Sequence, residues 1–319
     1  MHATRAIRGH RPREEESRCG SCFLSSKWPY FPIRFEHGVC AGFNASLKSP
    51  CRSRRLEKRP EVPLAIPHAL LAPILASPAD DRPRLAAAGA LTGDPARAEF
   101  IRLQVRRAAA ERAMDDSQMG VMLAQEQRLE RPDFDDGVGA LGVTATVKRG
   151  FVQQVKADAG VFIMRAGAIR KVAPLLELSL SKAELHLDVL CDTAILDGIV
   201  SLDLIDSRIG DAGGERLARS KHLQALRWLD LRRNGLTRAG LDALCASPLS
   251  SRLRWLHVAG DGISAPHDKP VEEDGRLIDF EGTELGRELE AQHGPLRWLH
   301  HHATRLRFHP PSMSHFILD

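Results

Sequence analysis

Leucines recur at a fixed spacing along the C-terminal half of the chain. The string LRWL occurs three times, beginning at Leu226, Leu253 and Leu296. Aligned on this string, the first two copies follow the pattern LxxLxLxxNxL with a period of 27 residues. Two earlier units begin at Ile199 and Leu175. The pattern predicts a short strand whose alternate side chains point inward, followed by a turn and a segment that packs behind the strand.

The segments that follow the predicted strands carry apolar residues at helical spacing. GDAGGERLARSKHL follows Ile209, and TRAGLDALCASPL follows Leu236. One unit cannot bury its own apolar face, so stacked units are expected to form a parallel sheet backed by helices. Units of this length with helical returns resemble the ribonuclease-inhibitor-like class of leucine-rich repeats. The resemblance implies an α/β fold for residues 148–319: a short solenoid with parallel strands inside and helices outside.

The third copy of LRWL departs from the regular period. It begins 43 residues after its predecessor and has His301 where an inward leucine is expected. We therefore predict a degenerate unit that caps the repeats. The extra length predicts an exposed loop as an insertion near 264–279, with the outer helix at Phe280 to Gln292.

Residues 63–130 predict a helical region before the repeats. Helices are expected around Ala69 to Leu75, after Asp81, and from Ala96 to about Met114. The blocks ILASPADDRPRL and GDPARAEFIRLQ occur in order and resemble the short repeat-companion domain found beside leucine-rich repeats in bacterial genomes. AAAGALTGD departs from the aromatic, acidic stretch usual between them. The resemblance implies a role in recognition or scaffolding, with no reaction attached.

The entry into the repeats is predicted from KRGFVQQVKADAGVFIMRAGAIRKVAPLLELSL, which starts at Lys148. We expect residues 131–147 to be a loop or linker and the sheet to begin with Phe151, Val152 and Val155. The first outer helix is expected around Gly160 to Val172.

Residues 1–62 differ in composition from the remainder. They are rich in Arg, Ser, Pro and Cys, have no sustained apolar period, and are predicted to be a disordered basic tail. They carry 13 Lys or Arg and 6 Asp or Glu, a net charge of +7 that leaves −3 for the other residues. The composition change near Val62 also fits a biological start further downstream. Four of the six cysteines lie in this tail: Cys19, Cys22, Cys40 and Cys51.

The tail cysteines have the spacing C-x2-C-x17-C-x10-C. The first pair could offer two thiolates to zinc, but the second half lacks the close pair of a persuasive motif. Unpaired thiols in a flexible tail are therefore the favoured interpretation. The basic residues of the tail predict at most non-specific contact with phosphates, so no specific nucleic-acid partner is expected.

Sequence motifs of catalysis are missing from the chain. There is no P-loop, no G-x-S-x-G and no H-E-x-x-H. The run from His300 to His302 has no carboxylate or thiol at ligand spacing. We therefore expect no enzyme activity, no cofactor and no metal. The most apolar stretch, from Val62 to Ala76, is short and interrupted by prolines, so we expect a cytoplasmic protein with no membrane partner.

In the pattern LxxLxLxxNxL, the leucines at positions four and six point inward, so the side chains at positions three, five and seven point to the opposite face of the sheet. Large aromatic residues gather at these positions. Tryptophan beside Asp, Arg and His is the composition of a protein-binding hot spot. The alternative is that the tryptophans stack along the sheet and only shield it. The residues predicted to bind a partner are Trp228, Trp255, Trp298, Asp203, Asp230, Arg232, His257 and His300.

These patterns favour a non-enzymatic scaffold that binds an unidentified protein partner on the concave face of the repeats. The alternative is a regulatory protein of the GTPase-activating type, which rests on fold-level analogy alone. The pathway and the oligomeric state stay open. The position that usually holds a turn-bonding Asn is uneven, which predicts a less regular array than a consensus repeat: Ala183, Ser207, Asn234 and Asp261.

Overall fold

The computed structural model describes residues 66–113, 115, 117–258, 269–273, 276–281 and 283–300. These residues belong to one compact unit, Lys58–Asp319. The predicted disorder of residues 1–62 lies outside the described residues. So do these individual residues: Cys19, Cys22, Cys40, Cys51, Asp261, His301 and His302.

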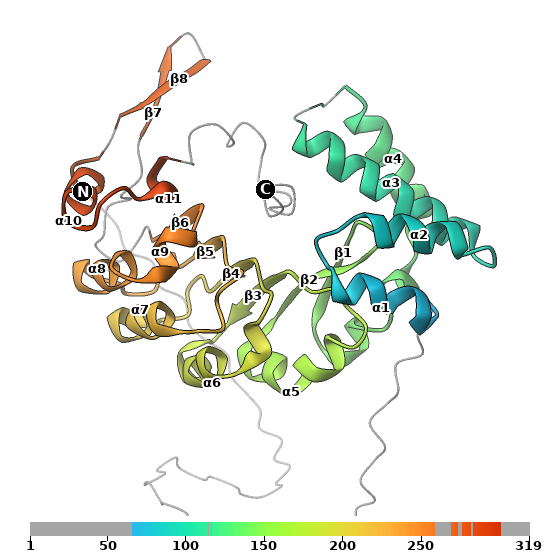
Figure 1. The fold of residues 1–319 in the computed structure, drawn as a ribbon, viewed down its shortest axis with the longest axis horizontal. Coiled ribbons are helices and arrows are strands. Elements are labelled where there is room, and N and C mark those ends of the chain that lie inside the picture. Colours follow the sequence, from blue (N-terminus) through green and yellow to red (C-terminus); the bar gives the residue numbers. More distant parts are fainter. Residues whose placement is uncertain are drawn as a thin grey trace, which may run out of the picture. The chain divides into compact units, whose positions relative to one another are not determined.

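A six-stranded, mostly parallel sheet organises the α/β fold (Figure 1). Its strands follow chain order from β1 to β6, and only the pair β1 and β2 is antiparallel. The strand bounds are β1 (Thr144–Lys148), β2 (Phe151–Asp158), β3 (Glu177–Ser181), β4 (Ser201–Asp203), β5 (Trp228–Asp230) and β6 (Trp255–His257).

The first strand corrects the predicted boundary of the sheet. The expected linker 131–147 runs into β1, which pairs with β2 through a tight turn. Arg149 and Gly150 in that turn both have positive φ, 51° and 83°, as two-residue hairpin turns require. The alternating β-branched residues of TATVK suit a strand, although the leucine repeat does not extend to them.

One row of leucines crosses the parallel strands and forms the core. Leu178, Leu202, Leu229 and Leu256 are paired in register, and each is at most 2% exposed. The steps along this row are 24, 27 and 27 residues, as the sequence period predicts. Because strand side chains alternate, this row faces the helices and the neighbouring positions face the other way.

Helices follow one another along the leucine side of the sheet (Figure 1). Their close packing depends on small residues: a Cβ on Gly214 would lie 2.9 Å from Leu236 Cδ2 and 3.3 Å from the Gly240 carbonyl oxygen. The helices expected after Ile209 and after Leu236 are present. The bounds are α5 (Ala159–Ile169), α6 (Leu187–Asp192), α7 (Gly210–Arg219), α8 (Arg238–Cys245) and α9 (Pro248–Arg252).

Buried polar side chains satisfy the turns after the strands. The Asn234 side-chain oxygen accepts from the Ser207 and Ile209 N–H groups at 3.1 and 3.4 Å, and its amide donates to the Leu204 carbonyl at 2.9 Å. The Ser207 hydroxyl donates to the Leu180 carbonyl at 3.3 Å. Each unit is thereby bonded to the one before it. This is the role that the sequence position of Asn234 predicts.

A helical layer precedes the sheet, with a second core of its own. Leu71, Ile74, Ile101 and Val105 pack there together with Phe151 of β2. The helices lie where the sequence predicts the helical region, and Met119–Leu129 is a further helix. Their bounds are α1 (His68–Ala76), α2 (Arg82–Ala90), α3 (Pro95–Arg112) and α4 (Met119–Leu129).

Buried arginines connect this layer to the β1–β2 turn. Arg149 donates to Asp81 at 2.8 Å, and Arg97 donates to Asp136 at 3.0 Å and to the Gly150 carbonyl at 2.8 Å. Both arginines are 2% exposed. Burial raises the pKa of Asp136 to about 6, against the opposing effect of Arg97. No periodicity in the sequence indicates this network.

The C-terminal elements differ from prediction. A hairpin of β7 (Lys269–Glu273) and β8 (Arg276–Glu281) lies within the expected loop and its predicted helix, so α10 (Glu284–His293) begins later than expected. The third LRWL forms a helical turn, α11 (Arg297–His300), rather than a strand. This turn contacts β6 and buries the side chains of Trp298 and Leu299.

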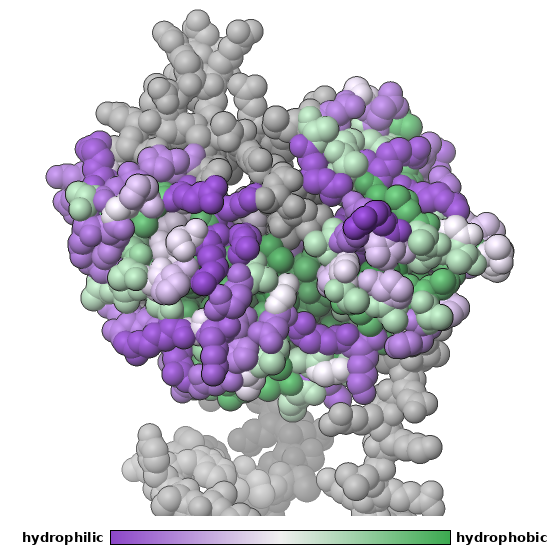
Figure 2. Space-filling model, in the orientation of Figure 1, coloured by the Kyte–Doolittle hydropathy of each residue, from purple (hydrophilic) through white to green (hydrophobic). Residues whose placement is uncertain are grey.

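Surface and interior sort by polarity. Hydrophilic residues cover most of the outer helices on the face drawn in Figure 2, with apolar residues interspersed. Cys191 and Cys245 are buried, as expected of small apolar residues, and burial raises the pKa of each thiol to about 12. Among the described residues, no helix combines the length and the apolar composition needed to cross a membrane.

Candidate functional site

Strand pairing aligns a column of side chains on the face of the sheet opposite the leucines. Glu177 pairs with Ser201, Ser201 with Trp228, and Trp228 with Trp255. The spacing in the sequence predicts this register. We call the surface formed by this column and its neighbours on β3 to β6 the tryptophan face.

The two tryptophans of this face stack on each other. Their ring centroids are 5.9 Å apart with an interplanar angle of 35°. The edge of the His257 ring meets Trp255 at 5.2 Å and 85°. The sequence predicts that both tryptophans are exposed. Trp228 is half-buried, whereas Trp255 is only 9% exposed, so only Trp228 presents appreciable surface. Such aromatic pairs contribute about 0.5–1.5 kcal/mol beyond their burial.

A second column beside the tryptophans carries acids and a histidine. Asp203 pairs with Asp230, and Asp230 with His257. Ser179 donates to Asp203 at 2.8 Å. Burial lowers the pKa of His257, against the opposing effect of Asp230, so the imidazole is neutral at neutral pH.

Asp230 forms a bidentate ion pair with Arg232. The arginine Nε and Nη2 atoms donate to the carboxylate at 2.9 and 2.7 Å. The Asp230 side chain is 3% exposed, whereas the Arg232 side chain is 41% exposed. The two hydrogen bonds fix the orientation of the Arg232 guanidinium. Because the Asp230 carboxylate is buried, loss of this partner would leave an uncompensated buried charge.

Two predicted residues are not on this face. Trp298 is fully buried on α11, where its indole Nε1 donates to the Ser250 hydroxyl at 3.2 Å. His300 lies on the same turn and pairs with Glu290 at 2.7 Å. The third LRWL therefore supplies a core tryptophan, and the histidine that follows it contacts a carboxylate on α10. Trp228, Trp255, Asp203, Asp230, Arg232 and His257 remain together.

The chain matches no protein-family model, no curated protein and no solved structure. Its function is therefore inferred from its own residues. The tryptophan face presents a rigid aromatic surface with an ion pair and a neutral histidine, which suits recognition. Within the described residues, no group of three or more His, Cys, Asp or Glu side chains is placed to hold a metal ion.

Sequence reasoning missed the extension of this face onto β1 and β2. Lys148 of β1 binds Glu177 at 2.7 Å, and both side chains are buried. Gln154 and Lys156 of β2 pair with Glu177 and Ser179, so they continue the two columns. The only sequence signal for this continuation is the turn sequence KRG, residues 148–150, because the leucine pattern starts later in the chain.

Proposed function

We propose that the chain is a leucine-rich repeat protein that binds a protein partner through the tryptophan face. Its fold supports this class: parallel strands recur at the leucine spacing, with helices behind them. The helices α1 to α4 would serve as the repeat-companion region and cover the first strands. No reaction is assigned to the chain.

The observation that carries the proposal is the stacked pair of Trp228 and Trp255 beside the Asp230–Arg232 pair. Tryptophan and arginine are enriched among the residues that dominate binding energy at protein interfaces. Tryptophan buries a large rigid ring, and arginine offers several hydrogen-bond donors in a planar group. Stacking holds both rings in place before a partner arrives, which lowers the entropic cost of binding. The more exposed members of this set are Trp228, which is half-buried, and Arg232, whose side chain is 41% exposed.

The test is a pull-down with the full-length tagged chain from a lysate of its own cells. A Trp228→Ala, Trp255→Ala double variant is expected to lose the partners that the wild type recovers, and Trp228→Ala alone to weaken them. Because Trp255 is buried, thermal unfolding of each variant is measured alongside.

A matched control removes exposed apolar side chains elsewhere. Met164 on α5 and Leu185 in the short 3₁₀ helix Glu184–His186 are 69% and 83% exposed. The Met164→Ala, Leu185→Ala variant is expected to recover the same partners as the wild type. Recovery of those partners by the folded tryptophan variants would show the proposal to be wrong.

A further inference from the structure

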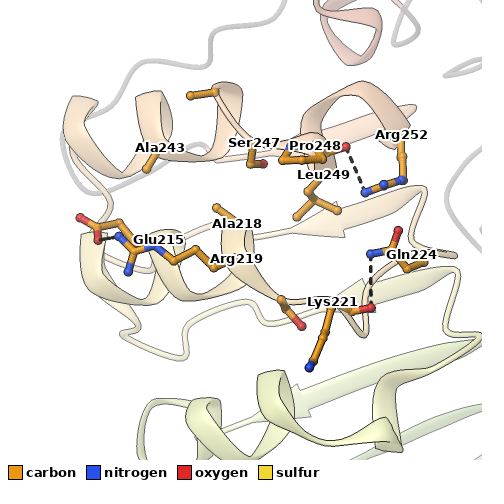
Figure 3. Close-up of a pocket in the computed structure, with 12 residues that line it drawn as sticks. Glu215, Ala218, Arg219, Lys221, Gln224, Ala243, Ser247, Pro248, Leu249 and Arg252 are labelled. Atoms are coloured by element: carbon orange, nitrogen blue, oxygen red, sulfur yellow. Dashed lines mark hydrogen bonds and ion pairs between the residues drawn. The ribbon is translucent and has the colours of Figure 1, made fainter.

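A groove lies between the outer helices, away from the strands that carry the tryptophan face. It has a volume of about 520 Å³ and is bounded by α7, by the segment that follows α7, and by α8 and α9. Its apolar lining comes from Ala218, Ala243, Ala246 and Leu249. Figure 3 shows Glu215 at one end of the groove and Lys221, Gln224 and Arg252 toward the other.

Cationic side chains gather at the second end. Arg227 and Arg254 hold the same position in successive LRWL strings, and the Arg254 N–H donates to the Arg227 carbonyl at 2.8 Å. Burial lowers the pKa of Arg227, and the charges of Arg254 and Arg252 lower it further. Arg252 lines the groove, so these three half-buried arginines join the groove to the start of β5 and β6.

The hydrogen bonds of these cations go to carbonyl groups. Arg227 donates to the Gln224 and Leu226 carbonyls at 3.1 and 2.9 Å, and Arg252 donates to the Pro248 carbonyl at 3.2 Å. Within the part of the chain that the structure describes, no carboxylate forms an ion pair with Lys221, Arg227, Arg252 or Arg254. Arg219 contrasts with them, because Glu215 binds it at 2.7 Å.

Like charges that lie close together repel each other, and this repulsion destabilises the protein. A bound anion reduces the repulsion, so it binds more favourably. A negative ligand at Arg227, Arg252 and Arg254 relieves their mutual repulsion, and their half-buried setting strengthens these contacts relative to open water. Lys221, an exposed cation that lines the groove, adds a fourth positive charge. The apolar lining accepts an aliphatic side chain at the same time. The groove is thus built for a ligand that combines both features.

We propose that this groove and the arginines beside it bind an acidic peptide segment of a protein partner. Its carboxylates would contact Lys221 and Arg252 in the groove and Arg227 and Arg254 next to it, and an aliphatic side chain would pack against Leu249. Nucleic acid fits less well, because none of the groove-lining residues is aromatic for base stacking and the apolar part of the lining is aliphatic. The proposal is independent of the tryptophan face, which uses other side chains.

Fluorescence anisotropy with short labelled peptides tests this site. A peptide of alternating glutamate and leucine is expected to bind the full chain, whereas its glutamine and leucine counterpart is not. The Arg227→Gln, Arg254→Gln variant and the Lys221→Gln, Arg252→Gln variant should each weaken binding by about tenfold or more, as expected for lost charge contacts. Circular dichroism establishes that each variant is folded.

The matched control removes two positive charges at the other end of the strands. Arg208 and Arg233 are exposed, and Arg208→Gln, Arg233→Gln should leave peptide affinity unchanged. Equal loss in this control would mean that net charge alone attracts the peptide and would overturn the site. Failure of the wild type to bind the glutamate peptide, or tighter binding of single-stranded oligothymidine, would overturn the acidic-peptide proposal. A Trp228→Ala, Trp255→Ala protein that keeps the peptide separates this site from the tryptophan face.

Discussion

Asn234 bonds two neighbouring strand turns through its side chain. It accepts from two N–H groups of the preceding turn and donates to the Leu204 carbonyl, all within a buried environment. Asn234→Ala leaves these backbone groups without partners and is expected to lower the free energy of unfolding by about 2–3 kcal/mol. Urea unfolding measures the loss. The neighbouring exposed Arg233→Ala is the control and should change stability little; equal losses would contradict the role of Asn234.

Gly150 occupies a position that no other residue fits. Its φ of 83° is left-handed, and a Cβ there would lie 2.9 Å from Ile101 Cα on α3. Gly150→Ala should therefore push α3 away from the β1–β2 turn. Gly235 has a similar φ of 70°, but a Cβ on it would meet nothing within 4 Å. Gly235→Ala therefore isolates the backbone strain, about 1 kcal/mol.

Comparison of the two alanine variants by thermal unfolding separates strain from steric clash. Gly150→Ala is expected to be destabilised by at least about 1 kcal/mol more than Gly235→Ala, because overpacking adds to the strain. Equal melting temperatures would mean that α3 shifts freely and that its contact with the turn contributes little.

At the scale of elements, identical residues adopt different structures. At the start of β5 and β6 the backbone N–H of the LRWL tryptophan donates to a carbonyl of the preceding unit. Trp228 donates to Val200, and Trp255 donates to Arg227. In α11 the Leu299 N–H instead donates within its own turn, to Leu296. The sequence LRWL therefore contributes to a strand where a neighbouring strand pairs with it, in β5 and β6, and to a helical turn after the last strand of the sheet, in α11.

α11 caps the sheet through Trp298. The side chain is fully buried and packs into the same core as the leucines. Trp298→Ala is expected to cost about 3–5 kcal/mol of unfolding free energy, measured by denaturant titration. Trp228→Ala, a half-buried tryptophan of the same string, is the control and should cost clearly less. A reversed order would contradict the division into a core tryptophan and a surface tryptophan.

Much of the parallel sheet and of its helices could be predicted from the sequence, and the reasons are local. The leucine spacing predicts the strands, the register of Trp228 on Trp255 and the helices behind them. Residues that meet only in the folded chain carry no such signal. Arg97 with Asp136, and Lys148 with Glu177, are separated by 39 and 29 residues, and neither pair belongs to a repeating pattern.

At the scale of the molecule, the buried Arg97–Asp136 pair makes stability depend on pH. Asp136 has a pKa of about 6 when folded, against an ordinary value of 3.8, so the folded chain binds the proton more tightly. Its contribution to stability is therefore present at low pH and is lost as pH rises through 3.8 to about 6. Acidification from about pH 7 to about pH 5 should raise its contribution by about 1 kcal/mol.

Asp136→Asn removes this titration. The difference in unfolding free energy between wild type and variant, measured by urea titration at both pH values, is expected to change in favour of the wild type at the lower pH. Other titrating groups cancel in the difference. A difference that stays constant with pH would show that Asp136 has an ordinary pKa and that water reaches its carboxylate in solution.

The β1–β2 hairpin and α11 close the two ends of the sheet, and this has a consequence for how such a surface can lengthen. A repeat strand added at the first end would meet β1, which runs in the opposite direction to the other strands, and one added at the second end would have to displace a buried tryptophan. Duplication of one internal 27-residue unit meets neither obstacle, because each internal strand offers the same hydrogen bonds to both neighbours. The tryptophan face can therefore be lengthened by whole 27-residue units inserted between existing strands, while both ends keep their present contacts.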